Sequence, residues 1–315
     1  MTHFIDQIKE TLKSKQQTIV LPEGTDSRIQ EAAIRLHEEG IIKPVVIGNV
    51  PELSERGIEV INPETYAYIE ELVEAFVLRR NGKTTPEQAR ELLKQVNYFG
   101  TLLVYTGKAN GLVSGAAHTT ADTVRPALQI IKTKPGIQKT SGAFIMAKGD
   151  TRYVFADCAI TIAPTSEDLA EIAVESAKTA SAFGIDPKVA LLSFSTKGSA
   201  VSEETEKVSR ALELAKEKDP ALSIDGELQF DASLVPSIAA KKAPGSEVAG
   251  QANVFVFPTL EAGNIGYKIA ERLGGFEAIG PILQGLNQPV NDLSRGCSAD
   301  DVYKLSYLTA AQSLQ

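Results

Sequence analysis

The sequence predicts an α/β fold with two domains and a cleft between them. Short β-rich runs, such as Thr18–Leu21 and Val189–Phe194, alternate with longer helical patterns. The alternation occurs in two successive regions, and it is typical of sheets that are covered by helices on both faces. A length of 315 residues fits one large domain or two medium ones.

The first region opens with a predicted buried strand at Thr18–Leu21. A helix follows, because Asp26 or Ser27 can cap its first turn and Gly40 can end it after about Glu39. The further elements expected here are a strand at Lys43–Ile47, helices at Ile69–Arg80 and Thr85–Leu93, a strand or helix end at Thr101–Tyr105, and a strand at Gly111–Ser114.

The second region is expected to begin with a hairpin of Ala143–Ala147 and Arg152–Phe155. Thr165 and Asp168 form a capping-box pattern for a helix that runs to about Phe183. The remaining expected elements are strands at Ala159–Ile162, Val189–Phe194 and Asn253–Phe257, and helices from Ser202 to about Lys218 and at Ile265–Leu273.

Composition limits the classes of function. The 32 basic and 40 acidic residues give a net charge of −8, which disfavours nucleic-acid and anionic-membrane surfaces but not an anion held in a local site. Two cysteines and three histidines are too few for a disulfide framework or a His-rich metal centre. No apolar run approaches membrane-spanning length and no apolar signal core is visible, so we expect a cytoplasmic protein.

The loop from Ser114 to Pro126 could carry chemistry. Its small residues would let backbone N–H groups face a ligand, and Arg125 could meet an anion; the alternative is a capping loop with a surface arginine. His118 and Asp122 match an H-x-x-x-D pattern of some CoA-dependent acyltransferases. Because that pattern is short, we favour a structural or ligand-lining His118 over a catalytic base.

Two further loops follow predicted strands, and a polar cluster lies near the C-terminus. Ser195–Ser199 resembles a phosphate cradle but lacks the Walker A pattern, so it is equally well a plain turn. Gly263 permits close backbone approach and Asn264 can cap a helix. In the C-terminal cluster, Ser298 and Asp301 fit a capping box, which leaves the polar turn that begins Ser294-Arg295 unexplained.

Long strings of the sequence resemble the phosphate acetyltransferase (phosphotransacetylase) family. These strings are VFPTLEAGNIGYKIAERLGG, GPILQGLNQPVNDLSRGCSADDVY, SGAAHTTADTVRPALQIIKTKPG and LLSFSTKGSA. The resemblance implies reversible acetyl transfer between CoA and phosphate, a homodimer, and a fold similar to isocitrate and isopropylmalate dehydrogenases. It also implies domains of residues 1–137 plus 288–315 and of residues 138–287.

The resemblance assigns catalytic roles to Ser294, Arg295 and Asp301. It assigns substrate binding to Arg125 and to Arg79, where the adjacent Arg80 is the less favoured choice. The substrate-binding prediction also includes Thr120, Ser141, Gly263 and Asn264. No metal or cofactor is implied, because CoA, acetyl-CoA, phosphate and acetyl phosphate are substrates.

The implied mechanism is direct transfer within a ternary complex. Asp301 would take the thiol proton of CoA, because the thiolate is the nucleophile, and Arg295 would stabilise the developing negative charge. Ser294 would bind the tetrahedral intermediate or place the thiol. Cys297 could instead form an acetyl-cysteine, but a small residue that packs under the turn is the favoured interpretation.

Other functions stay open. The nearest is a phosphate butyryltransferase or another short-chain acyl transferase of the same fold. A metal- and NAD-dependent decarboxylating dehydrogenase needs acidic ligands and a Lys/Tyr pair that we do not identify. A non-enzymatic ligand-binding protein is disfavoured by the intact Ser294, Arg295 and Asp301.

Overall fold

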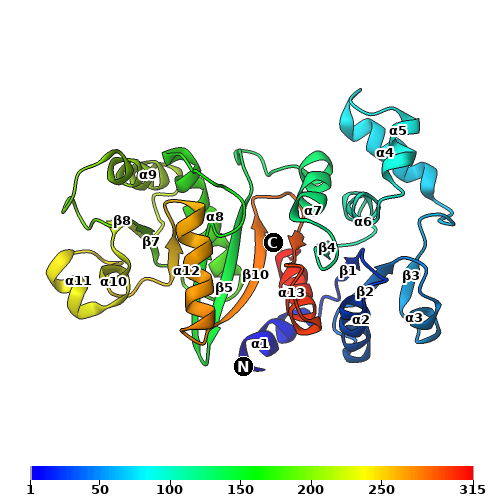
Figure 1. Ribbon diagram of the computed structural model, residues 1–315, viewed down its shortest axis with the longest axis horizontal. Helices are drawn as coiled ribbons and strands as arrows, with labels where there is room; N and C mark the ends of the chain where they lie inside the picture. Colours follow the sequence, from blue (N-terminus) through cyan, green and yellow to red (C-terminus); the bar gives the residue numbers. More distant parts are fainter. Residues whose placement is uncertain (1, 315) are drawn as a thin grey trace. The chain divides into compact units, whose positions relative to one another are not determined.

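The computed structural model describes residues 2–314, with side chains described from Phe4 onward. The chain forms two compact units (Figure 1). The terminal unit comprises Thr2–Lys134 and Leu286–Gln315, and the inserted unit is Pro135–Gly285. The boundary that the resemblance implies after residue 287 stays a prediction, and the neighbouring Asn287 bonds to residues 131–133 of the terminal unit. Its side-chain amide donates to the carbonyl oxygens of residues 131, 132 and 133 at 3.1, 3.2 and 2.7 Å.

The terminal unit contains a five-stranded sheet whose strand pairs are all parallel. In sheet order the strands are β11 (Val290–Asp292), β4 (Gly111–Ser114), β1 (Thr18–Leu21), β2 (Lys43–Ile47) and β3 (Glu59–Ile61). Because parallel strands end at one edge of a sheet, the loops that follow β11, β4 and β1 are neighbours. Ligands of α/β proteins bind at this kind of edge.

The helices of the terminal unit come from both ends of the chain. They are α1 (Thr2–Leu12), α2 (Ser27–Glu39), α3 (Pro51–Glu55), α4 (Ile69–Arg80), α5 (Pro86–Leu92), α6 (Val96–Tyr105), α7 (Thr120–Pro126), the π-helix η1 (Ala127–Ile131) and α13 (Ala299–Gln312). The last helix, α13, packs against α1 and α2, so the red and blue ends of the chain lie together in Figure 1.

The chemistry of the helix ends agrees with the predicted boundaries of α2. Asp26 is the N-cap, with its carboxylate accepting from the backbone N–H of Arg28 at 2.9 Å, and Gly40 ends the helix in the left-handed region at a φ of 67°. The ambiguous run Thr101–Tyr105 is helical and belongs to α6. Residues 97–104 of that helix are all buried, which explains why its sequence lacks a polar face.

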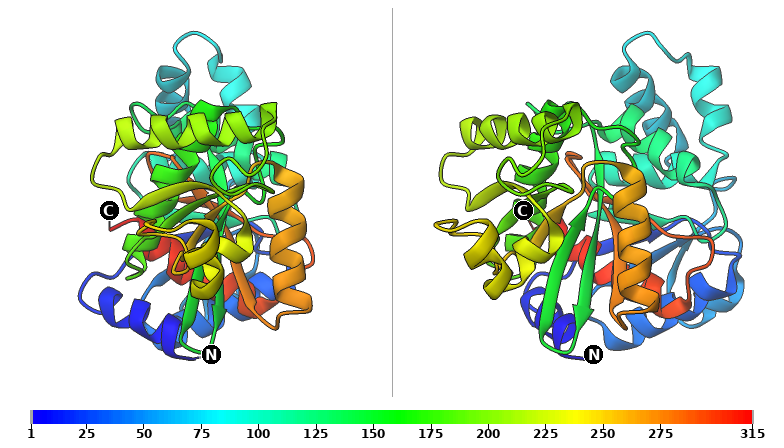
Figure 2. Two further views of the ribbon diagram at one scale, coloured as in Figure 1. Left: turned by 90° about the vertical axis from the view of Figure 1, so that its left-hand side faces the viewer. Right: turned by 60° about the vertical axis from the view of Figure 1, so that its left-hand side comes forward.

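The inserted unit contains a six-stranded mixed sheet. In sheet order the strands are β10 (Glu277–Gln284), β5 (Ser141–Lys148), β6 (Thr151–Ala156), β9 (Val254–Val256), β7 (Val189–Leu192) and β8 (Ile224–Leu228). The predicted hairpin is confirmed, because β5 and β6 pair antiparallel. The helices are α8 (Ser166–Ala182), α9 (Glu203–Lys218), α10 (Phe230–Leu234), α11 (Pro236–Lys242) and α12 (Leu260–Arg272). Figure 2 shows α12 beside the hairpin, which it contacts.

The strand expected at Ala159–Ile162 is wrong, since this segment is a bend without strand pairing. The carboxylate of Asp157 causes the bend. It accepts from the backbone N–H groups of Ala159, Ile160 and Thr161 at 2.8, 3.0 and 2.7 Å. The apolar segment 159–162 therefore bends around the buried carboxylate of Asp157 and does not pair with the sheet.

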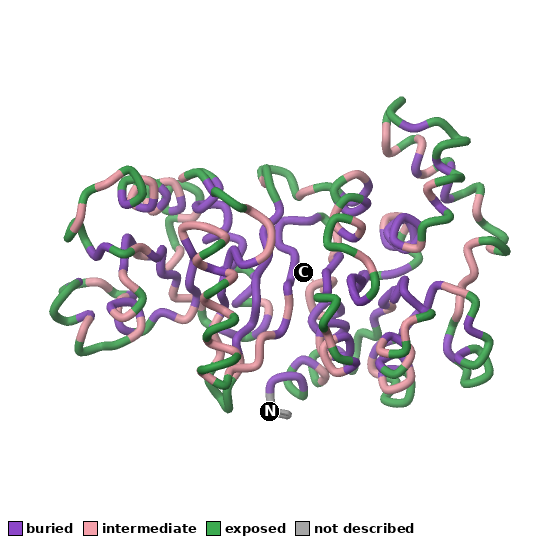
Figure 3. The backbone as a smooth tube through the Cα atoms, viewed as in Figure 1, coloured by how far each residue is buried: buried purple, intermediate pink, exposed green. Residues whose placement is uncertain are grey.

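The helix expected at Ile265–Leu273 begins five residues earlier, at Leu260. Its N-cap is Thr259, whose hydroxyl accepts from the N–H of Ala262, so the predicted capping role of Asn264 is wrong. Burial concentrates in the strands of both sheets, and exposed backbone lies mainly in helix faces and loops (Figure 3). None of the helices between residues 2 and 314 is long and apolar enough to cross a bilayer.

Candidate active site

The turn after β11 lies at the carboxyl edge of the terminal sheet. The backbone N–H of Leu293 donates to the carbonyl oxygen of Ser114 at 2.6 Å, so this turn lies against the loop that follows β4. Ser294 and Arg295 are both exposed. The Ser294 hydroxyl accepts the Gly296 N–H at 3.2 Å. Within residues 2–314 the Arg295 guanidinium has no hydrogen-bond or ion-pair partner, so it is free to meet an anion.

The guanidinium of Arg28 binds the backbone of this turn, a contact that the sequence did not predict. The guanidinium donates to the carbonyl oxygens of Arg295 at 2.7 Å and Cys297 at 3.0 Å, and to that of Ala116 at 2.6 Å. Asp26 fixes it through two bonds of 2.9 and 2.7 Å, and this contact lowers the pKa of the carboxyl. An arginine in the first turn of a helix opposes the helix dipole, and this unfavourable placement is the sequence feature that could have identified Arg28.

The small-residue loop after β4 binds an internal carboxylate. Glu23 is 3% exposed, and it accepts the backbone N–H groups of residues 115, 116, 117 and 118 at 2.8–2.9 Å. The expectation that these N–H groups face a ligand is therefore wrong. The Nδ1 atom of His118 also lies 2.8 Å from Glu23, while Asp122 bonds to Thr119. The H-x-x-x-D residues thus serve separate structural contacts.

Asp301 begins α13 and forms the predicted capping box with Ser298. Its Oδ2 atom accepts from the backbone N–H of Ser298 at 2.7 Å and from the hydroxyl at 2.8 Å. Its own N–H donates to that hydroxyl at 3.2 Å. All bonds of the carboxylate use Oδ2. Oδ1 has no hydrogen-bond partner among the described residues, so it can accept another proton.

Cys297 lies between Arg295 and Asp301 in the chain and is a free, half-buried thiol. Its sulfur is 3.7 Å from the Arg28 guanidinium. Burial nevertheless raises the pKa of the thiol to about 11. The thiol is therefore protonated at neutral pH and is a poor nucleophile, which favours the packing interpretation.

The two adjacent arginines at the end of α4 differ in their partners. Arg79 donates to the carbonyl oxygens of Ile130 and Ile131 at 2.5 and 2.8 Å. The Nε atom of Arg80 is buried and has no hydrogen-bond partner within residues 2–314. Burial raises the pKa of Tyr98, and the charges of Arg125 and Arg80 counteract this rise, so both guanidinium groups lie near one phenol. Arg125 itself is exposed and unpaired within the described chain.

The three predicted substrate-binding residues of the inserted unit make internal contacts. Ser141 is 4% exposed and donates to Gln284 at 2.9 Å, and the amide of Asn264 donates to the carbonyl oxygen of Cys158 at 3.0 Å. A side chain at Gly263 would come within 2.2 Å of the carbonyl oxygen of Asp157, so glycine is required for close packing there. Their assignment to substrate stays a prediction.

The loop at Ser195–Ser199 also surrounds an internal anion. Glu227 is 4% exposed, and it accepts the N–H of Gly198 at 2.7 Å and the hydroxyl of Ser195 at 2.9 Å. The polar loop that resembled a phosphate cradle is thus a turn organised around this carboxylate, and these contacts favour the second of the two interpretations.

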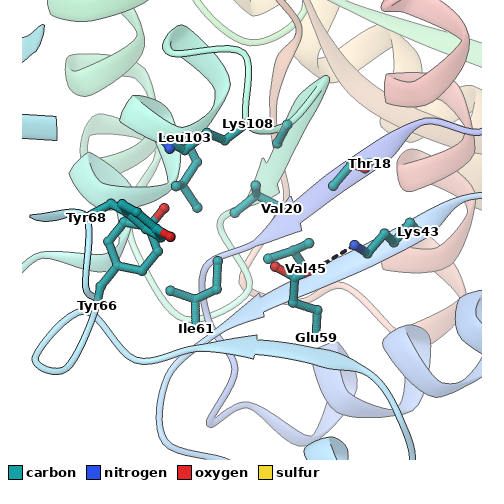
Figure 4. Close-up of a pocket in the computed structure, with 11 residues that line it drawn as sticks. Thr18, Val20, Lys43, Val45, Glu59, Ile61, Tyr66, Tyr68, Leu103 and Lys108 are labelled. Atoms are coloured by element: carbon teal, nitrogen blue, oxygen red, sulfur yellow. Dashed lines mark ion pairs between the residues drawn. The ribbon is translucent and has the colours of Figure 1, made fainter. Parts of the chain in front are cut away.

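A cavity of about 400 Å³ lies in the terminal unit, away from the turn after β11. It opens over the first residues of β1, β2 and β3, with Tyr66 and Tyr68 on one side, as Figure 4 shows. Its two lysines are already paired, Lys43 with Glu59 at 2.6 Å and Lys108 with Glu71 at 3.2 Å. This cavity therefore offers no free cation. Among the described residues, no group of three or more His, Cys, Asp or Glu side chains could hold a metal ion.

Comparison with known proteins adds independent evidence. The sequence model of a family described as "Phosphate acetyl/butaryl transferase" matches residues 3–310. The phosphate acetyltransferase of Bacillus subtilis is 62% identical, with both chains fully covered. Two solved structures are similar. EutD phosphotransacetylase from Staphylococcus aureus has 60% identity, 98% coverage of each chain and a TM-score of 0.93. A phosphotransacetylase from Streptococcus pyogenes has 56% identity, coverage of 100% and 99%, and a TM-score of 0.95.

A more distant likeness concerns the fold alone. A Salmonella typhimurium structure, assigned provisionally as a 4-hydroxythreonine-4-phosphate dehydrogenase, has a TM-score of 0.55 at 14% identity and covers 96% of this chain and 100% of its own. The two-domain α/β architecture is thus shared with a dehydrogenase-like structure.

Proposed function

The chain belongs to the phosphate acetyl/butaryl transferase family, and we propose that it transfers an acetyl group reversibly between CoA and phosphate. The observation that carries this proposal is the exposed turn after β11. There Arg295, which has no partner in the described part of the chain, lies beside Ser294 at the edge of the sheet where α/β proteins bind ligands. Relatives that are 60–62% identical over the full chain bear the name of this activity.

The first chemical step is removal of the thiol proton of CoA. A free thiol has a pKa of about 8.5, so most of it is protonated at neutral pH, and a base must remove the proton. We assign the base to Asp301, because Oδ1 is its free oxygen while Oδ2 is held by the capping box. The proton moves from the thiol sulfur to Oδ1, and the thiolate becomes the nucleophile.

The thiolate sulfur then attacks the carbonyl carbon of acetyl phosphate. The carbon–sulfur bond forms, negative charge collects on the carbonyl oxygen, and the bond from carbon to the bridging phosphate oxygen breaks. The departing phosphate takes up the proton from Oδ1 of Asp301, which restores the carboxylate. Arg295 stabilises the oxyanion and the departing phosphate, because a guanidinium fork matches either group. The hydroxyl of Ser294 donates a hydrogen bond to the tetrahedral intermediate. The products are acetyl-CoA and phosphate.

Anion binding falls to arginines without internal partners. Among the described residues, Arg125 is exposed and unpaired and the buried Nε of Arg80 has no partner, whereas Arg79 already binds two carbonyl oxygens. We therefore favour Arg80 over Arg79 as the second anion-binding arginine. CoA enters as a substrate and no cofactor takes part. A cytoplasmic location stays the expectation drawn from the sequence.

The proposal includes a homodimer that forms through the inserted unit. One stripe of α12 is exposed and apolar, with Ile265, Ile269 and Leu273 at 57%, 53% and 84% exposure. An apolar cavity of about 450 Å³ adjoins it, and Ile269 and Phe230 line this cavity. Exposed apolar patches of this kind are typical of interaction sites, and a second copy would cover the stripe. An Ile269→Glu variant should then be monomeric by light scattering, and an unchanged dimer would exclude this surface.

The direct test is an assay of phosphate-dependent CoA release from acetyl-CoA, read with a thiol reagent. We expect release that requires phosphate, and release that is independent of phosphate would contradict the proposal. Initial rates with butyryl-CoA decide the acyl range. A kcat/KM that is higher for butyryl-CoA than for acetyl-CoA would make this chain a butyryltransferase instead.

A further inference from the structure

Asp292 is a buried carboxylate that lies next to the proposed site in the chain. It is the last residue of β11 and is 2% exposed, two positions before Ser294. In the parallel register its strand partner is Ser114, the last residue of β4. No step of the proposed mechanism uses its carboxylate.

Its contacts reach the loop after β4 and the start of α7. The Oδ2 atom accepts a hydrogen bond of 2.6 Å from the hydroxyl of Thr120, the first residue of α7. The Oδ1 atom faces the loop after β4 so closely that a Cβ on Gly115 would come within 2.5 Å of it. Asp292 is therefore the point at which the turn after β11, the loop after β4 and the start of α7 meet.

We propose that Asp292 is a positioning residue for acetyl transfer, an inference that rests on the function proposed above. Through Thr120 it fixes the start of α7, the helix that carries Arg125, against the turn that follows β11. The 2.6 Å separation is typical of a hydroxyl that donates to an ionised carboxylate, which is stronger than a neutral bond. Helix α7 and β11 pack against each other, so the bond joins two elements that already touch.

The placement is costly for folding, which argues for a role in the reaction. Burial raises the pKa of Asp292, and the charge of Glu23 adds to the rise. A carboxylate that is hard to ionise weakens the folded state at neutral pH, whereas an asparagine would accept the Thr120 bond without that cost. A residue that served stability alone would not need the charge.

The test is a double-mutant cycle of Asp292→Ala and Thr120→Val, assayed for kcat, for the KM of CoA and of acetyl phosphate, and for Tm. Each single variant should raise the KM for CoA about tenfold, because a helix displaced by a fraction of an ångström misplaces its arginine. The double variant should be no worse than Asp292→Ala, since both changes remove one bond. Asp292→Asn, which keeps an acceptor oxygen but loses the charge, should recover only part of the CoA affinity, because a neutral bond to Thr120 is weaker.

Each outcome decides the proposal. Additive losses in the double variant, or a fall in Tm without a change in the KM for CoA, would overturn it. If Asp292→Ala does not fold, Thr120→Val at its exposed position decides alone, and an unchanged KM for CoA refutes the inference. A wild-type protein without acetyl transfer refutes the proposed function and this role together, whereas an active wild type with an additive cycle refutes this role alone.

Discussion

The peptide carbonyl of Arg295 accepts a hydrogen bond of 2.7 Å from the guanidinium of Arg28, although the two residues are 267 positions apart in the chain. The same guanidinium binds the carbonyl oxygens of Cys297 and Ala116. One side chain thus joins the turn after β11 to the loop after β4. The proposed catalytic arginine is held through its backbone, which leaves its own side chain free for substrate.

Replacing Arg28 with lysine should therefore damage catalysis. An ammonium group is a point charge and cannot bridge three carbonyl oxygens and a carboxylate with fixed geometry. We expect kcat to fall by roughly 10²-fold, because small displacements of catalytic groups have effects of this order. Arg35→Lys on the same helix is the matched control, since Arg35 pairs with Asp300 at 3.1 Å on the partly exposed side of α2. Equal losses in both variants would contradict a specific role for Arg28.

The Asp301→Asn variant separates the base from the helix cap. Asparagine can still accept the hydrogen bonds from Ser298 but cannot take a proton from the thiol, so kcat should fall by about 10²-fold or more while the KM for CoA changes little. Ser298→Ala is the control, because it removes the capping hydroxyl, which typically costs about 1 kcal/mol, and keeps the carboxylate. If Ser298→Ala loses as much activity as Asp301→Asn, capping alone explains the effect.

The adjacent arginines of α4 give a matched pair for substrate binding. Arg80→Gln should raise the KM for CoA about tenfold with an unchanged Tm, because its guanidinium has no bond to the protein at Nε. Arg79→Gln should lower the free energy of unfolding by roughly 1–3 kcal/mol with little change in KM, since it removes the Arg79 hydrogen bonds to both carbonyl oxygens and leaves that of Ile131 with Asn287 alone. The reverse pattern would restore Arg79 as the substrate arginine.

Cys297→Ala should keep most of the wild-type kcat. Burial raises the pKa of this thiol to about 11, so almost none of it is thiolate at pH 7–8. Labelled acetyl-CoA should correspondingly leave no acetyl group on the protein after quenching and peptide mapping. A labelled peptide that contains Cys297, or a variant without activity whose fold is intact, would establish the covalent route instead.

The sequence predicted those features that depend on neighbouring residues. Asp26 and Gly40 bound α2 as expected, and the capping boxes of Thr165 with Asp168 and of Ser298 with Asp301 are confirmed. Each depends on residues within one turn, where the side chain and the backbone group that it satisfies are fixed by the sequence itself. Capping patterns are therefore readable from a single chain.

The sequence did not reveal which loops are filled by the protein's own carboxylates. The loop after β4 and the loop Ser195–Ser199 both contain small and hydroxyl residues that suit a bound anion. In the structure they bind the protein's own carboxylates, Glu23 and Glu227. Glu23 lies 92 residues before Gly115, and no local pattern links them. The role of Arg28 was missed for the same reason, since Arg295 lies 267 positions after it. Long-range electrostatic contacts decide these loops, and only the fold brings the partners together.

Asp292→Asn should make the protein more stable, and increasingly so as the pH rises. The pKa of Asp292 is raised from 3.8 to about 6 by burial and, to a smaller extent, by Glu23, while Thr120 acts in the opposite direction. Between these values the folded state holds a proton that the unfolded state has lost, so the stabilising effect of that proton disappears as the pH rises through about 6. The asparagine variant has no such loss.

Chemical unfolding at pH 4, 5, 6 and 7 should therefore show that the free energy of unfolding of Asp292→Asn rises by roughly 2 kcal/mol relative to the wild type over this range. Asp300→Asn is the control of opposite sign. Its ion pairs with Arg35 and Lys304 lower its pKa despite burial, so that variant should be less stable than the wild type at pH 7, with the difference shrinking as the pH falls. A difference for Asp292→Asn that is independent of pH would mean that the buried carboxyl titrates normally.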